Sequence, residues 1–563
     1  MRRTIIILLS CLHFQFINSQ SIDVSYERAQ SLSNMADFYY TAGNYDKAID
    51  LQRQSMDIMD QLFGKNSYNY ANSAMTIAKY YYSKGNYMSS NMDSLGAKEC
   101  FSNAYTNLKN VEKVTRDSML VRFGNMDHKE RYVLWQQISP LYQRLLPCYV
   151  EKYQNESTLS DLYNSVLISK GITWRNIDEV FKGDWRKVQK NLGPDEIAIE
   201  FISPLMLDDE SIVLYALFLR KNDRSPQMIK LFDLDEFDDN LKNASSELDR
   251  DLRVGRLIWG ALEKELKSIR NIYFSASFVL NTIPIEYLPI NESDYYGDRY
   301  NFYRLSSTME LTNRKMKPQY KNAVIYGGLD YDSNSEYIRS NEKNRDRAGL
   351  EKLFSTDVEI KDVSQSLKSN GVNCENYTDS LGTESSFRNL SGQKIDILHL
   401  STHSKFDVYE ELSSLYIDED KGLSSSYLAL SGANKILTDS QINRDDDGVI
   451  TALDISRMNL KGLDLVCLSS CQSGLGSMSD DDGILGLQMG FKIAGANTIL
   501  MSVHKVDDEA TRLLMVEFYK NLMSGKTKHQ SLKDAQKYLR KVENGKYDKP
   551  EYWASFIMLD GLN

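Results

Sequence analysis

The chain has 563 residues, of which 42% are hydrophobic and 26% charged, and its formal net charge is −11. A chain of this length is too long to fold around one hydrophobic core, so we expect a soluble globular protein of three or four domains. The acidic balance repels phosphate backbones and excludes nucleic acid as a general partner. Beyond the N-terminus, no segment approaches the ~20 uninterrupted apolar residues of a membrane-spanning helix.

Residues 1–19 predict an export signal. Two arginines precede a mostly apolar run from Thr4 to Phe16, and the small Ser19 stands at the expected cleavage point. We therefore expect a bacterial protein exported to the periplasm, the outer surface or the medium. The stretch "LLSC", which ends at Cys11, looks like a lipoprotein box, but apolar residues continue past it. Cleavage near Ser19 is favoured over a lipid anchor at Cys11.

Residues 20–175 predict helical repeats. The stretches "ADFYYTAGNYDKAIDL" and "AKYYYSKGNYMSS" share G-N-Y at Gly43 and Gly85, 42 positions apart. The pattern resembles a tetratricopeptide repeat in a 42-residue form, with a glycine at the turn between two helices. A third, degenerate helical pair is predicted from Ala97 to Leu108. Such a module would bind a protein partner, and the alternative is an unrelated helical bundle.

From Glu196 the apolar pattern changes to that of strands alternating with helices, which indicates a mostly parallel sheet covered on both faces. Ligands of such sheets bind at the carboxyl ends of strands, where His403 and Cys471 stand. The predicted helices are "GRLIWGALEKELKSI" and "STDVEIKDVSQSLKSN". The predicted strands are "EIAIEFI", "SIVLYALFL", "NIYFSASFVL", "NAVIYGGLDY", "DILHLSTH", "DLVCLSSC" and "NTILMSV".

A cysteine nucleophile needs a base that favours its thiolate. Cys471 ends an apolar run and precedes a polar, glycine-rich turn, and His403 can supply the base. Cys467 lies inside the same run and predicts a buried apolar thiol. After removal of the signal five cysteines remain, an odd number that indicates at least one free thiol. The local residues leave a catalytic and a structural role for Cys471 both open.

An ordered series of motifs extends over about Glu196 to Gly561. It includes "ILHLSTHSKF", "DLVCLSSCQSGLG", "DDGILGLQMGFKIAGANTILMSVHKVDDEAT" and "PEYWASFIMLDG". Together these resemble the CHAT domain, a caspase-like, separase-related family of cysteine peptidases often found behind tetratricopeptide repeats. The resemblance implies a caspase-like α/β fold, with residues 176–320 as its N-terminal part and 321–563 as the peptidase domain.

The same resemblance implies peptide-bond hydrolysis, with protein or peptide substrates. His403 would be the general base and acid, and Cys471 the nucleophile. The backbone N–H groups of Cys471 and Ser404 would form the oxyanion hole. The chain departs from the family pattern at three places, where Ser404 replaces a glycine, His504 a tryptophan, and "SASF" the "SPDG" turn before "IPxExL". An inactive caspase-like scaffold that only binds proteins is therefore the alternative.

Two acidic residues stand where separase-like relatives select a basic P1 side chain. Asp508 is the nearest match, with Asp507 beside it. A carboxylate in a partly dry pocket would hold arginine by a bidentate bond. The alternative is a helix cap or a first-turn charge before "EATRLLMVEFYKNL".

We expect no cofactor. His399 and His403 have the spacing of zinc ligands on a helix, but Leu400 stands where a metalloprotease has glutamate. The stretch "NRDDDGVITALD" nearly matches a calcium-binding loop. A similar stretch belongs to the CHAT pattern, which explains the match without calcium. Its candidate ligands are Asn443, Asp445, Asp447 and Asp454. Neither a phosphate-binding loop nor a G-x-S-x-G serine nucleophile is present.

Overall fold

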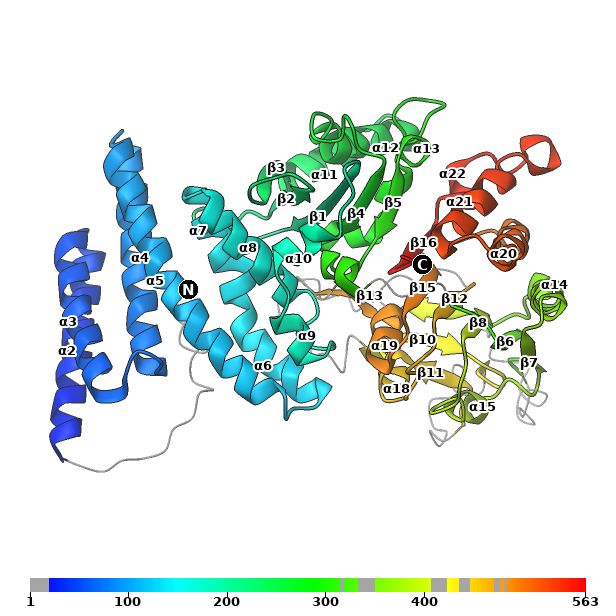
Figure 1. Cartoon of the computed structure of the whole chain (residues 1–563), viewed down its shortest axis with the longest axis horizontal. Helices are drawn as coiled ribbons and strands as arrows, with labels where there is room; N and C mark the ends of the chain where they lie inside the picture. The colour runs from blue at the N-terminus through cyan, green and yellow to red at the C-terminus, as the bar shows by residue number, and fades with distance from the viewer. Residues whose placement is uncertain are drawn as a thin grey trace, which may run out of the picture. The chain divides into compact units, whose positions relative to one another are not determined.

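The computed structural model divides the chain into two compact units (Figure 1). The first contains the N-terminal helices up to Trp185 and two later segments, 203–214 and 223–234, and the second contains most of the remaining chain. The structure describes residues 20–313, 318–332, 350–406, 423–434, 446–469, 476–479 and 483–563.

The first unit is a succession of helices joined by short turns. In it α2 packs against α3, α3 against α4 and α4 against α5. Side-chain caps start several of them, because an oxygen of Asn44, Ser67, Asp93, Asp127 or Asn155 accepts a free N–H of the first turn. The helices are α2 (Gln20–Thr41), α3 (Tyr45–Phe63), α4 (Tyr68–Ser90), α5 (Ser94–Phe123), α6 (His128–Pro140), the π-helical turn η1 (Leu141–Leu145), α7 (Leu146–Lys152), α8 (Glu156–Ser169) and α9 (Ile177–Phe181).

Tyrosines hold the first helices together. The rings of Tyr40 on α2 and Tyr80 on α4 stack with their centroids 4.7 Å apart. The Tyr80 hydroxyl donates a hydrogen bond to Asp37 at 2.9 Å, and the Tyr40 hydroxyl lies 2.9 Å from that of Ser83. Gly43, with φ +77°, occupies the predicted turn between α2 and α3. This backbone conformation favours glycine.

The second G-N-Y element does not form a turn, contrary to the prediction. Gly85 lies within α4, where an added Cβ would sit 2.6 Å from the ring of Phe101. The glycine instead allows α5 to approach α4 closely. The turn comes later, at Asn91 to Asp93, and Ala97 to Leu108 belongs to the one long helix α5 rather than to a third pair.

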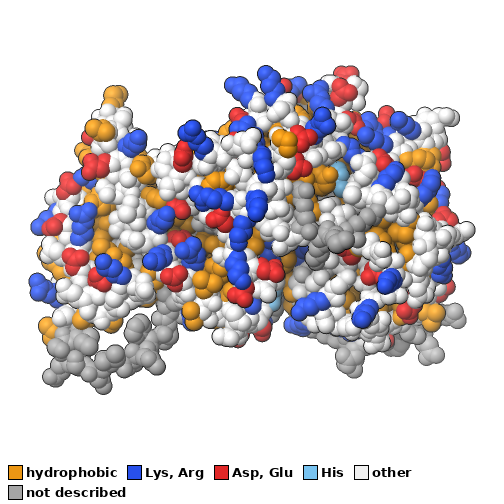
Figure 2. Space-filling model, in the orientation of Figure 1, with side chains coloured by type: hydrophobic (Ala, Val, Ile, Leu, Met, Phe, Trp, Pro, Cys, Tyr) orange, Lys and Arg blue, Asp and Glu red, His pale blue; other side chains and the backbone are white. Residues whose placement is uncertain are grey.

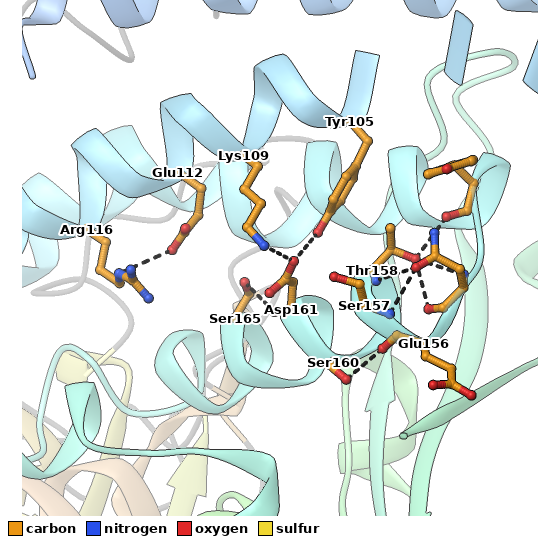
Figure 3. Close-up of polar contacts among 12 residues, drawn as sticks. Tyr105, Lys109, Glu112, Arg116, Glu156, Ser157, Thr158, Ser160, Asp161 and Ser165 are labelled. Carbon is orange, nitrogen blue, oxygen red and sulfur yellow. Dashed lines mark hydrogen bonds and ion pairs between the residues drawn. The ribbon is translucent and has the colours of Figure 1, made fainter. Parts of the chain in front are cut away.

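Helix α8 is fixed to α5 through one carboxylate (Figure 3). The Tyr105 hydroxyl donates to Asp161 at 2.9 Å, and the Lys109 ammonium pairs with the same oxygen. Burial and the nearby Asp161 raise the pKa of Tyr105, so the phenol remains a donor. The Ser165 hydroxyl donates to the Asp161 carbonyl at 2.9 Å. Polar contacts therefore set the position of α8 along α5.

The second unit is built on one sheet with the strand order β2-β1-β4-β5-β16-β15-β12-β8-β6-β7. Most neighbours are parallel; β2 on β1 and β16 on β15 are antiparallel. This confirms the predicted mostly parallel sheet. The strands are β1 (Glu196–Ile202), β2 (Val213–Arg220), β4 (Asn271–Ser275), β5 (Asn301–Arg304), β6 (Asn322–Leu329), β7 (Asn373–Asp379), β8 (Ile397–Ser401), β12 (Leu465–Leu468), β15 (Thr498–Ser502) and β16 (Phe556–Leu559).

Smaller elements complete the chain. They are β3 (Gln227–Asp233) in the first unit, a sheet of β9 (Ser404–Phe406), β10 (Ser426–Ala429) and β11 (Val449–Thr451), and a hairpin of β13 (Gly476–Ser479) and β14 (Gly483–Gly486). The helices are α10 (Trp185–Lys190), α11 (Leu234–Lys242), α12 (Glu247–Gly255), α13 (Tyr296–Arg299), α14 (Phe354–Ser369), α15 (Glu384–Arg388), α18 (Ala452–Ser456), α19 (Leu487–Ala494), α20 (Asp508–Met523), α21 (Lys528–Leu539) and α22 (Pro550–Trp553).

Both faces of the central strands are buried. On one face the side chains of Ile397 and Leu465 join a core with α14, α20 and α21, while Leu398 and Val466 on the other face are equally buried. Such two-sided burial explains why these strands read as continuous apolar runs. Within the described ranges, no helix combines the length and apolarity needed to cross a membrane. Figure 2 shows basic and acidic side chains intermixed over the face drawn.

Two glycines bring α14 against the end of β6. A Cβ at Gly327 would lie 2.6 Å from Ile360, and one at Gly328, whose φ is +62°, would lie 1.9 Å from the Asp357 carboxylate. The N–H of Gly328 donates to the Thr356 hydroxyl at 3.0 Å. The stretch "GGLDYD" thus serves close packing of helix on strand.

Two predicted elements are shorter than expected. Strand β4 ends at Ser275, and the residues after it form a 3₁₀ helix, η3 (Phe278–Thr282). The predicted helix "GRLIWGALEKELKSI" begins at the last residue of α12, Gly255, and continues as the π-helical turn η2 (Arg256–Gly260) and then as turns. Trp259 within it is fully buried, and its indole N–H donates to the Ile285 carbonyl at 2.7 Å. Here tertiary packing overrides helix propensity.

Candidate active site

The strands that lead to His403 and Cys471 are neighbours. β8 and β12 are parallel, with Cys467 opposite His399, and the N–H of Ser469 donates to the Leu400 carbonyl at 2.9 Å. Both strands therefore end at the same edge of the sheet. Cys471 lies outside the described residues, which on this strand extend to Ser469.

His403 lies two residues beyond β8 and is half-buried. Its ring atom Nε2 is 2.8 Å from the main-chain oxygen of Glu351. A carbonyl oxygen can only accept, so Nε2 carries the hydrogen in this contact. In the neutral ring Nδ1 is then the basic nitrogen.

Tyr331 fixes the backbone at this histidine. Its hydroxyl lies 2.9 Å from that of Thr402 and accepts the His403 N–H at 3.3 Å. The Tyr331 and His403 rings also contact, with their centroids 5.1 Å apart. Burial raises the pKa of Tyr331, so its hydroxyl stays protonated. The His403 carbonyl accepts the Ala429 N–H at 2.9 Å, which ties the histidine to β10.

Ser404 is accommodated without backbone strain. It begins β9 and lies opposite Leu428 in the antiparallel pair with β10. Extended backbone of this kind is open to every residue, so the position does not require the glycine of the family pattern.

The cysteines that the structure describes, Cys100, Cys148, Cys374 and Cys467, form no disulfides. Cys467 is fully buried, 3.4 Å from the sulfur of Met515, and burial raises its pKa well above that of an ordinary thiol. This confirms the predicted buried apolar thiol. Burial also raises the pKa of Cys374, which is half-buried on β7.

The two acidic residues at the start of α20 have different roles. Asp507 is the N-cap, and its carboxylate accepts the Ala510 N–H at 2.9 Å, in agreement with the alternative weighed for it. Asp508 lies exposed on the first helical turn. His504 is likewise exposed, shortly before the helix.

Two of the four candidate calcium ligands, Asn443 and Asp445, lie outside the described residues. Asp454 is the third residue of α18 and forms a capping box with the N-cap Thr451, whose N–H it accepts at 3.1 Å; it also pairs with Arg388 at 3.1 Å. Burial works against its charge, but these bonds lower the pKa of Asp454. Asp447 accepts the Val449 N–H at 2.9 Å, and burial raises its pKa. The described part of the chain contains no group of three or more metal-ligating side chains.

A buried polar cluster under the two strand ends was missed from the sequence. Glu359 of α14 accepts hydrogen bonds from the hydroxyls of Ser401, at the end of β8, and Ser469, just after β12. A signal was present, because "LHLS" and "VCLS" have leucine and then serine at matching positions where the two strands end. The acceptor lies 42 residues before Ser401 and gave no local sign.

Comparison with known proteins agrees with this architecture. Residues 253–561, more than half of the chain, match the CHAT domain, and the chain belongs to this family. Residues 27–88 match a tetratricopeptide repeat. The sequence resemblance is thereby confirmed for both parts.

Curated relatives match over a short segment. Tetratricopeptide repeat protein 28 of Mus musculus is 30% identical over 111 residues, which are 20% of this chain and 4% of that protein. The Homo sapiens protein of that name is 29% identical over 111 residues, with the same shares covered. The chain thus spans only a small fraction of these relatives.

Among solved structures, the Saccharomyces cerevisiae separase–securin complex is 9% identical, with a TM-score of 0.43, and covers 98% of this chain and 54% of that one. The Arg-specific cysteine proteinase gingipain R is 8% identical, with a TM-score of 0.34, and covers 56% of this chain and 68% of that one.

Proposed function

We propose that the protein is a cysteine endopeptidase with a His403–Cys471 dyad. The observation that carries this is the register of β8 and β12. His399 and Cys467 are opposite one another, and the dyad residues each follow four positions later. Cys471 comes two residues after Ser469, so its Cα is at most about 7 Å from that of Ser469. His403 is within the same short reach of the end of β8.

In this proposal Nδ1 of His403 takes the thiol proton of Cys471, while the Glu351 carbonyl keeps the hydrogen on Nε2. The thiolate attacks the peptide carbonyl carbon, and the N–H groups of Ser404 and Cys471 stabilise the oxyanion. His403 then protonates the leaving amine as the C–N bond breaks. Water hydrolyses the thioester, releases the acid and restores the thiol.

The dyad predicts selective labelling of Cys471. An electrophilic peptide with lysine or arginine at P1 should modify Cys471 much faster than the half-buried Cys374, whose pKa is raised by burial. Intact-mass and peptide mass spectrometry of the mature protein would locate the label, with Cys471→Ala as the unlabelled control. Equal rates at the two thiols would instead support the inactive scaffold.

A basic P1 preference is proposed from Asp508, which is exposed on the first turn of α20. Asp508→Asn should lower kcat/KM for arginine-P1 peptides by about 10- to 100-fold, the value of a charge-assisted bond. The matched control is Glu509→Gln, because Glu509 is already paired with Arg512 at 2.7 Å and should not contribute. Faster turnover of aspartate-P1 peptides by the wild type would contradict the assignment.

The helical unit is proposed to bind a protein partner or substrate of this peptidase, which we also propose to be exported. Tetratricopeptide repeats commonly present such surfaces. Large aromatic side chains are exposed on the described repeats, with Phe38 at 68% and Tyr87 at 60% of full exposure. Exposed aromatic residues are enriched at protein interfaces.

A further inference from the structure

We propose that Glu359 is a positioning residue that holds the ends of β8 and β12 at the separation the dyad needs. The inference rests on the proposed peptidase function. Glu359 lies on α14, outside both strands. The proposed role requires no contact between its carboxylate and a substrate.

Each oxygen of the Glu359 carboxylate contacts the end of one strand. Oε2 of Glu359 accepts the Ser401 hydroxyl at 2.9 Å, and Oε1 accepts the Ser469 hydroxyl at 2.6 Å. Ser401 stands two residues before His403, and Ser469 stands two residues before Cys471. One carboxylate therefore joins the two backbone segments that lead directly to the dyad.

Burial makes these bonds strong restraints. Glu359 is 2% exposed, and both serines are buried. A buried carboxylate has no water to replace a lost partner, so separating either strand end from it is costly. His399 Nε2 also lies 3.1 Å from Oε1, although it is not aligned for a hydrogen bond. The other nitrogen, Nδ1, lies 3.2 Å from the Tyr519 hydroxyl.

The helix that carries Glu359 is itself firmly placed. Arg512 of α20 pairs with Asp362 of α14 at 3.0 Å, and Thr356 accepts the Gly328 N–H. Nearby apolar residues of the same helix, including Ile360 and Val363, join the buried core. The position of α14 is therefore transmitted through Glu359 to both strand ends.

The experiment removes one arm of the contact at a time. Ser401→Ala and Ser469→Ala should each lower kcat for a peptide substrate by about 10- to 100-fold with little change in KM, because small displacements of reacting groups are that costly. Glu359→Gln should be milder, since an amide can accept from one serine and donate to the other.

The matched control is Ser364→Ala on the same helix. Ser364 is also buried, but its hydroxyl bonds Asn376 of β7 at 3.2 Å, away from the dyad strands. Loss of this bond should lower the thermal unfolding midpoint about as much as Ser469→Ala does, and leave kcat unchanged. A merely structural role for Glu359 would make the three serine variants alike in kcat.

A second measurement tests the positioning of the Cys471 thiol without relying on peptide cleavage. The pH profile of Cys471 alkylation by iodoacetamide should move toward that of an ordinary thiol in Ser401→Ala and Ser469→Ala, but not in Ser364→Ala. An unchanged profile and unchanged kcat in the first two variants would overturn the proposal even if the wild type cleaves peptides. If the wild type cleaves none, the peptidase assignment fails, while the alkylation profiles still decide whether Glu359 positions the thiol.

Discussion

Replacement of His403 by alanine is expected to lower kcat for peptide cleavage by about 100- to 10,000-fold, the usual contribution of a general acid and base. The ring is held by the Glu351 carbonyl at Nε2 and by contact with Tyr331, which leaves Nδ1 as the basic nitrogen. Alanine removes that base without touching Cys471. Steady-state kinetics on a fluorogenic peptide would measure the loss.

Added imidazole provides the control for His403→Ala. It should restore part of the rate, because the truncation leaves space for a free base beside the contacts of Glu351 and Tyr331. The thermal unfolding midpoint should stay near that of the wild type, since the side chain is only half-buried. Full activity of the variant would remove His403 from the mechanism and return the site to the binding-only alternative.

The elements that the sequence predicted best are those whose burial shows in a long apolar run. β1, β6 and β15 are of this kind, and their predicted and observed ranges agree closely. Strand β7, with the sequence "NCENYTD", was missed because it stands at the edge of the sheet and is largely exposed. Strand β5 is only four residues long and offers too short a pattern.

The candidate site shows the same division. His403 and Cys471 were predicted because side-chain type and position at strand ends both carry information. The contact of His403 with the Glu351 carbonyl could not be predicted, because every residue has a main-chain oxygen. Tyr331 lies 72 residues before His403, and its role depends on a fold-level contact. The same holds for Glu359, because its partners Ser401 and Ser469 come together with it only when α14 packs against the sheet.

A buried ion pair between Arg304 and Glu286 lies where two groups of strands of the large sheet join. β16 pairs with β5 through Leu559 and Arg304, which joins β1, β4 and β5 to the strands of the candidate site. Arg304 bonds both carboxylate oxygens of Glu286, at 2.8 and 2.7 Å, and donates to the Ile283 carbonyl at 2.8 Å. Glu286 is the glutamate of the "IPxExL" stretch, and both partners are buried.

Arg304→Met should destabilise the α/β unit by about 3–5 kcal/mol, because it leaves the Glu286 carboxylate buried without its partner. The midpoint of urea unfolding, followed by tryptophan fluorescence, would report the change. The double variant Arg304→Met with Glu286→Leu should recover much of the loss, since an apolar pair of similar volume has no charge to desolvate. Lys520→Met, at a pair with Glu517 whose lysine is exposed, should cost less than about 1 kcal/mol. If the double variant were no more stable than Arg304→Met, the instability would come from lost packing and lost carbonyl contacts rather than from the stranded charge.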